Sequence, residues 1–113
     1  MARLSTHVLD TSRGVPAAKV SIDLYRGGSH LKSVTTNADG RTDEPLISAP
    51  ELIRGRYELI FHAGDYFRGL EVPISDPPFL DEIAVRFGIS DPLGNYHVPL
   101  LLSPYGYSIY RGT

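Results

Sequence analysis

Two histidines and two arginines are the residues of this chain best suited to proton transfer and charge stabilisation. His7 and His97 lie near opposite ends of the sequence, Arg41 lies between them, and Arg111 lies close to the end. Histidine exchanges a proton near neutral pH, so an imidazole is a natural general base for activating water. Arginine offers a fork of N–H donors to a planar, electron-rich ligand or to a developing negative charge. Such residues suit water activation beside a polar ligand if the fold brings them together.

The last four residues add further polar groups. Tyr110, Arg111, Gly112 and Thr113 supply a phenol, a cation, a residue without a side chain, and a hydroxyl beside the terminal carboxylate. Residues 105–113 predict a strand that runs to the end of the chain, and its alternation would put Tyr110 and Gly112 on one face. The glycine would let a flat ligand approach the backbone closely. Arg111 also has a purely structural interpretation, as a partner of the terminal carboxylate.

Simpler interpretations exist for each candidate when the residues are taken alone. His7 alternates with Thr6 and Val8, so it faces outward if those two face the core. His7 and His97 would then be ordinary surface histidines, and Arg41 a solvated loop arginine. Two histidines are too few for a usual zinc site, so no metal is expected. The other two histidines match no functional position, and they are His30 and His62.

The elements that must position these groups are short strands. Eleven glycines and nine prolines divide the chain at roughly the spacing of an all-β sandwich. We expect a single domain over residues 1–113, an all-β, eight-stranded antiparallel sandwich of two sheets with one short helix at residues 63–70. The predicted strands cover residues 4–9, 20–25, 30–36, a short stretch within 41–53, 56–62, 82–87, 97–103 and 105–113, with a loop at 11–16 and a turn at Gly40 that requires positive φ.

Composition excludes several classes of protein. The net charge of −2 gives no electrostatic case for binding nucleic acid or an anionic membrane. No apolar run is long enough to span a membrane, and the absence of cysteine excludes disulfides and thiolate metal sites. The first residues lack the apolar region of a secretory signal, so we expect a cytoplasmic protein, although a mature form without its leader would look the same.

Motifs at both ends give the chain a family resemblance. The sequence His-Val-Pro-Leu-Leu-Leu-Ser-Pro at residues 97–104 and the ending Tyr-Arg-Gly-Thr resemble the close of the transthyretin-like 5-hydroxyisourate hydrolases, which usually end in Tyr-Arg-Gly-Ser. The sequence Leu-Ser-Thr-His-Val-Leu-Asp at residues 4–10 and the Asp-Gly-Arg turn at 39–41 match the same family. Thr113 keeps the hydroxyl of the usual serine and adds a methyl group.

The resemblance implies a function, an assembly and a set of site residues. It implies cofactor-independent hydrolysis of 5-hydroxyisourate to 2-oxo-4-hydroxy-4-carboxy-5-ureidoimidazoline in urate degradation, by a homotetramer with sites at the dimer–dimer interface. The implied catalytic residues are His7, Arg41, His97 and Thr113, and the implied substrate-binding residues are His7, Arg41, Tyr110, Arg111 and Gly112. Either histidine could be the general base.

Two rival functions fit the same strand pattern. A non-enzymatic small-molecule carrier of the transthyretin type would line its channel with apolar and small groups, whereas this sequence has polar groups at His7, Arg41 and Tyr110. A structural or adhesion sandwich would tolerate loss of its C-terminus, since fold alone does not fix function.

Overall fold

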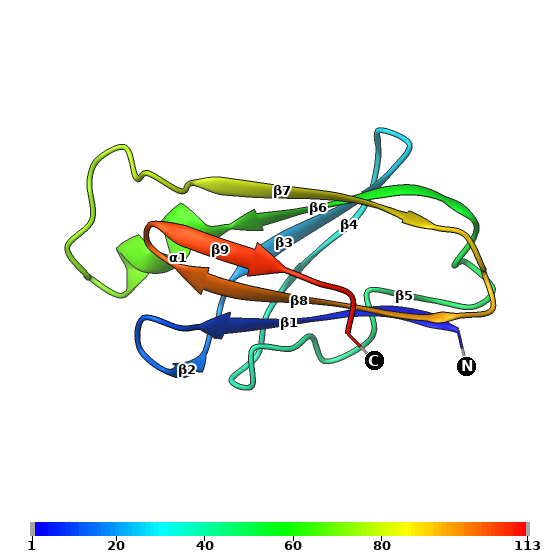
Figure 1. Ribbon diagram of the computed structural model, residues 1–113, viewed down its shortest axis with the longest axis horizontal. Coiled ribbons are helices and arrows are strands. Elements are labelled where there is room, and N and C mark those ends of the chain that lie inside the picture. Colours follow the sequence, from blue (N-terminus) through cyan, green and yellow to red (C-terminus); the bar gives the residue numbers. More distant parts are fainter. Residues whose placement is uncertain (1, 113) are drawn as a thin grey trace.

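Two sheets with apolar facing sides form the computed structural model, which describes residues 2–112 (Figure 1). The first sheet has the order β2-β1-β8-β9, with β5 also paired to β1, and consists of β1 (Arg3–Asp10), β2 (Val15–Pro16), β5 (Ile47–Ser48), β8 (Asn95–Ser103) and β9 (Gly106–Ile109). The second sheet has the order β4-β3-β6-β7 and consists of β3 (Ser21–Arg26), β4 (Ser29–Thr35), β6 (Gly55–His62) and β7 (Glu82–Ile89).

The expected sandwich with one short helix is confirmed. Each of the eight predicted strands is present, and the two-residue strand β2 is added where a loop was predicted, because Val15 and Pro16 pair with the end of β1. The β1–β8 pair is parallel, whereas the other strand pairs within residues 2–112 are antiparallel. The prediction of a strand to the chain end is wrong, because β9 stops at Ile109.

Alternation along the strands builds the core. In β1 the side chains of Leu4 and Val8 are fully buried between the sheets, and in β6 those of Leu59 and Phe61 are buried opposite them. Each such side chain contributes roughly 1.5–3 kcal/mol through removal from water. The alternate residues, such as Ser5 and His7 in β1, therefore face outward, on the side of the sheet where a site can lie.

The helix α1 (Ala63–Gly69) follows β6 directly and anchors the end of β1. Asp65 lies in its first turn, where a carboxylate suits the exposed N–H groups, and Tyr66 and Phe67 face the core. The Tyr66 hydroxyl donates a 2.8 Å hydrogen bond to the Asp10 carboxylate at the end of β1. Burial and this bond raise the pKa of Tyr66, so the phenol stays a donor at physiological pH.

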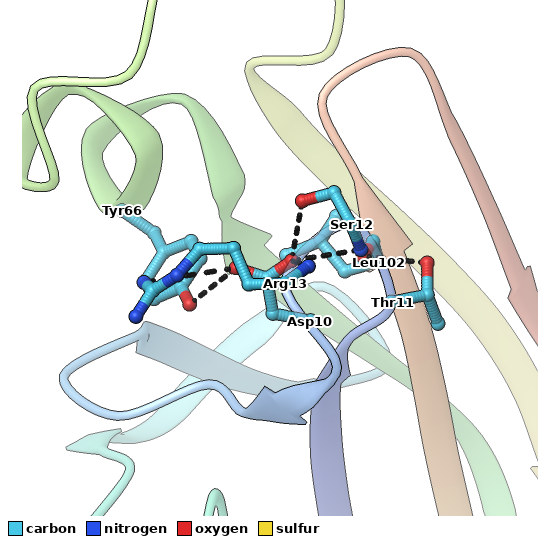
Figure 2. A network of polar contacts seen from close by, with 6 residues as sticks. All are labelled: Asp10, Thr11, Ser12, Arg13, Tyr66 and Leu102. Atoms are coloured by element: carbon cyan, nitrogen blue, oxygen red, sulfur yellow. Dashed lines mark hydrogen bonds and ion pairs between the residues drawn. The ribbon is translucent and has the colours of Figure 1, made fainter.

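The fully buried Asp10 carboxylate is the centre of a polar network (Figure 2). Its Oδ1 accepts hydrogen bonds from the Ser12 backbone and hydroxyl and from the Arg13 backbone, while Oδ2 accepts from Tyr66. The Arg13 guanidinium lies 3.9 Å from Oδ2. Both carboxylate oxygens thus accept hydrogen bonds, and together they join the loop after β1 to the helix. Within residues 2–112 no helix is both long and apolar enough to cross a membrane.

Candidate functional site

The outward face of β1 and β8 collects the polar residues that the interior excludes. In β1, Leu4, Thr6 and Val8 are buried while Ser5 and His7 are half-buried on the other side. The parallel register places Ser5 beside His97 and His7 beside Pro99. The sequence expectation that His7 faces outward is confirmed, and His97 shares its face.

A tight turn at residues 37–41 brings Arg41 to this face. The Asn37 side chain accepts hydrogen bonds from the backbone N–H groups of Asp39 and Arg41, and the Gly40 carbonyl accepts one from Val8 at 2.8 Å. Gly40 has φ +73°, and a Cβ there would lie 2.3 Å from the Val8 carbonyl oxygen. Only glycine can come this close to the β1 backbone with a positive φ. The predicted turn glycine therefore also allows the loop to pack against β1.

His7 is held by the same turn. Its Nε2 lies 2.9 Å from the Asp39 carbonyl oxygen. Since a carbonyl can only accept, Nε2–H is the donor, and Nδ1 is the nitrogen with the free lone pair when the ring is neutral. This hydrogen bond fixes the orientation of the His7 ring. Its partner, Asp39, is two residues before Arg41 in the same turn.

His97 is a candidate base whose protonation is shifted by its surroundings. Burial lowers the pKa of His97 below its ordinary value of 6.5, and the positive charge of Arg41 and the neighbouring His7 lower it further. A hydrogen bond to the Ser5 backbone opposes this shift. The ring is therefore neutral at physiological pH, and one of its nitrogens has a lone pair available for a proton.

A cavity of about 330 Å³ lies over these groups. Its lining combines two guanidinium groups, an imidazole, a hydroxyl and an amide, from the residues Arg3, Ser5, Arg41, Asn95, Tyr96 and His97. The structure thus brings the predicted residues Arg41 and His97 together, with His7 beside them. Arg3, Ser5 and Asn95 were not singled out from the sequence, although the alternation of β1 that turns His7 outward applies equally to Arg3 and Ser5.

Gly112 lies directly on His97. Its N–H donates a 2.7 Å hydrogen bond to the His97 carbonyl, and a Cβ at this glycine would lie 2.7 Å from Cδ2 of the imidazole. The close approach predicted for a ligand is therefore made, within the chain, by a histidine ring. Figure 1 shows the chain running on from the end of β9, and Gly112 pairs antiparallel with His97 of β8.

Tyr110 and Arg111 take a different place from the one their strand alternation suggested. Both line a second cavity, of about 290 Å³, that lies between β7 and the edge of β8 and β9. The Arg111 guanidinium stacks 4.4 Å from the centre of the Tyr96 ring and donates a 3.3 Å hydrogen bond to the Asn95 carbonyl. In one subunit these side chains do not join His97 and Arg41. Thr113 lies outside the described residues.

The two histidines without an expected role form a chain of hydrogen bonds on the outer face of the other sheet. The Ser33 hydroxyl donates to Asp23 at 2.6 Å, and the His62 Nε2 lies 2.8 Å from the other carboxylate oxygen. His30 Nε2 lies 2.8 Å from Ser33 Oγ, which must accept because its proton goes to Asp23. Among residues 2–112, no group of three or more metal-ligating side chains is placed to hold an ion.

Comparison with known proteins gives the family. The family model described as the HIUase/Transthyretin family matches residues 4–112. The chain is 56% identical to 5-hydroxyisourate hydrolase 2 of Rhizobium meliloti, over 98% of this chain and 96% of that protein. It is 54% identical to the 5-hydroxyisourate hydrolase of Deinococcus radiodurans, over 97% and 95% of the two chains.

Solved structures agree in fold. The Klebsiella pneumoniae 5-hydroxyisourate hydrolase superposes with a TM-score of 0.85 at 36% identity over the full length of both chains. A crystal structure of (S)-allantoin synthase has a TM-score of 0.95 at 42% identity, covering 99% of this chain but 44% of that one. Transthyretin from Sparus aurata, at 24% identity and a TM-score of 0.87, shows the fold alone.

The fold and the polar cavity define a transthyretin-like sandwich with a candidate active site on the outer face of one sheet. The chain belongs to the HIUase/transthyretin family.

Proposed function

We propose that this protein hydrolyses 5-hydroxyisourate to 2-oxo-4-hydroxy-4-carboxy-5-ureidoimidazoline, a step of urate degradation. The observation that carries the proposal is one cavity lined by both the His97 imidazole and the Arg41 guanidinium. The choice of substrate rests on the two relatives named 5-hydroxyisourate hydrolase, which are 56% and 54% identical over nearly the whole chain.

In the proposed reaction His97 is the general base. A neutral imidazole is needed to take a proton from water, and the lowered pKa of His97 keeps it neutral across the physiological range. The water oxygen attacks a ring amide carbon as its proton passes to His97. The ring C–N bond then breaks, the protonated imidazole returns the proton to the departing nitrogen, and the ring opens to a carboxyl group.

Arg41 is proposed to stabilise the negative charge that develops on the attacked carbonyl oxygen. A guanidinium in a partly enclosed cavity contributes a few kcal/mol to such a transition state, or roughly 10²–10³ in rate. Within residues 2–112 the Arg41 guanidinium has no hydrogen-bond or ion-pair partner, so its donors are available to a substrate. His7, held by the Asp39 carbonyl, is proposed to bind the substrate through its free Nδ1.

The remaining predicted residues are assigned to a site built between subunits. We propose a homotetramer in which the outward face of β1 and β8 meets another dimer, as the family resemblance implies. Tyr110 and Arg111 line a separate cavity in one subunit, which favours a role for Tyr110 across an interface. Gly112 would close the site beside His97, Thr113 is proposed as a catalytic residue because the family resemblance implies it, and no cofactor takes part.

The polar lining argues against a carrier of the transthyretin type. A carrier binds its ligand chiefly through apolar burial, whereas this cavity has guanidinium, imidazole and amide groups around one aromatic ring. The cytoplasm is the proposed location.

The test is the ultraviolet decay of freshly generated 5-hydroxyisourate. The protein should accelerate the decay, and Arg41→Ala should remove roughly 10²-fold or more of that acceleration. Arg54→Ala, which removes an exposed arginine away from the cavity, is the matched control and should leave the rate unchanged. Deleting residues 111–113 should abolish turnover in a folded protein. A wild-type protein without effect on the decay would refute the proposal.

A further inference from the structure

Within residues 2–112, Ser5 is the only residue that forms a hydrogen bond with a ring nitrogen of His97. Its Oγ lies 2.8 Å from Nδ1, and the two residues are direct neighbours in the parallel β1–β8 register. Both side chains are half-buried. The contact joins two rigid strands rather than two loops, so the ring is held by the sheet itself.

The opposite edge of the imidazole is also occupied. Cδ2 is the ring atom that an added Cβ at Gly112 would meet at 2.7 Å, and the Gly112 N–H is bonded to the His97 carbonyl. A half-turn of the ring would move Nδ1 away from Ser5 and leave it against a residue that has no side chain to bond it. The observed orientation is therefore fixed, and Nε2 is the nitrogen left without a partner in the described part of the chain.

The position of the single proton on a neutral ring decides what Nε2 can do. With the proton on Nε2, that nitrogen can only donate; with the proton on Nδ1, Nε2 has a lone pair and can accept. A hydroxyl at Nδ1 is compatible with either form, because serine donates and accepts. The other groups around the ring therefore determine which tautomer is present.

Charge around the cavity favours the proton on Nδ1. Arg3 and Arg41 both line the cavity that His97 lines, and their positive charges attract a lone pair and repel an N–H dipole. Asn95 also lines the cavity, and its side-chain amide can donate to or accept from either tautomer of His97. The Ser5 side offers its hydroxyl oxygen, which lies 2.8 Å from Nδ1 and can accept a hydrogen bond from Nδ1–H.

We propose that Ser5 is a positioning residue that accepts the Nδ1–H of His97 and so keeps the Nε2 lone pair available to take a proton from water. The inference rests on the proposed hydrolysis, whose base it orients. Removing the hydroxyl would leave the ring in place but let it adopt the Nε2–H form that free histidine prefers in water. A wrong tautomer costs an enzyme far more in turnover than in substrate binding.

Nitrogen NMR of protein labelled at histidine tests the tautomer in the resting enzyme, without substrate. We expect a protonated Nδ1 and an unprotonated Nε2 for His97 in the wild type, and a shift toward Nε2–H in Ser5→Ala. Turnover of Ser5→Ala should fall by roughly 10–100-fold with KM changed by less than about twofold, since general-base help is worth roughly 10²–10⁴ in total. Ser5→Thr, which restores a hydroxyl on a β-branched strand residue, should recover both the spectrum and most of the rate.

Ser21→Ala is the matched control, because Ser21 is an exposed strand serine of the other sheet. It should change neither spectrum nor rate. A wild-type His97 protonated on Nε2, or a Ser5→Ala protein with wild-type tautomer and turnover, would overturn the role of Ser5. A wild-type protein with the expected tautomer but no effect on 5-hydroxyisourate would instead refute the proposed function.

Discussion

Two polar clusters share strand β1, and they differ in what their hydrogen-bonding groups contact. At the end of the strand, the fully buried Asp10 carboxylate accepts hydrogen bonds at both oxygens, from Ser12, Arg13 and Tyr66. Beside the outward face of the same strand, His97 of β8 and Arg41 of the 37–41 turn keep a ring nitrogen and a guanidinium free of any partner in residues 2–112. The Asp10 carboxylate lies inside the protein, whereas His97 and Arg41 line a cavity.

The difference separates polar groups that stabilise the fold from groups that can act on a ligand. A buried carboxylate must have all its hydrogen bonds satisfied, and the loop after β1 and helix α1 are arranged to do so. Groups with free donors and lone pairs are tolerated only where water or a ligand can reach them. Loss of the Asp10 network should therefore reduce stability, and loss of the cavity groups should reduce activity.

The largest expected effect is on activity. His97→Ala removes the proposed base and should lower turnover of 5-hydroxyisourate by roughly 10²–10⁴-fold. Its unfolding free energy should change by no more than about 1 kcal/mol, because the ring is only half-buried. Initial rates and urea denaturation measure the two quantities. A variant that lost stability in proportion to activity would remove the distinction between the clusters.

The reverse pattern is expected for Asp10→Ala. It leaves the buried Tyr66 hydroxyl without an acceptor and should reduce the unfolding free energy by about 3 kcal/mol. Turnover per folded molecule should stay near the wild-type value, since Asp10 does not line the cavity. Tyr66→Phe removes the donor as well as its hydrogen bond and should cost about 1 kcal/mol.

The pH dependence of activity should follow from the low pKa of His97. Burial, Arg41 and His7 hold that pKa below 6.5, so more than half of the rings are neutral at pH 6.5. We expect kcat/KM to decline as the pH falls, with a midpoint below 6.5, because His97 then takes a proton. Stability should fall in the same direction, because the unfolded chain binds this proton more readily than the folded one. A decline in rate whose midpoint lies above 6.5 would exclude His97 as the base.

The smallest expected effect concerns His62, which has the opposite shift. Its hydrogen bond to Asp23 raises the pKa of His62 above 6.5, so its stabilising contribution is complete below 6.5 and is lost as the pH rises through the folded value. The two side chains are 24% and 23% exposed, and such a pair contributes about 0.5 kcal/mol. His62→Gln should lower the unfolding free energy by that amount in mild acid and by less at alkaline pH. An equal loss at both would show that the ion pair contributes nothing.

Local patterns were sufficient for much of the fold and for part of the site. Alternation located the long strands and turned His7 outward, and Gly40 marked the turn that carries Arg41, because these features depend on neighbours in sequence. The sequence did not locate the end of the last strand, which stops at Ile109. The contact of Arg111 with Tyr96 likewise joins residues that no local pattern relates.

By itself, the sequence determined the sandwich class, the outward direction of His7 and the family to which the chain belongs, because strand period, turn glycines and terminal motifs are local features. Only the tertiary structure decided that Ser5 contacts His97, that Gly112 covers the same ring, and that Arg3 and Arg41 line one cavity with it. Those contacts depend on the parallel register of β1 and β8, which joins chain segments about ninety residues apart. No short-range propensity specifies such a register; the packing of the two sheets does.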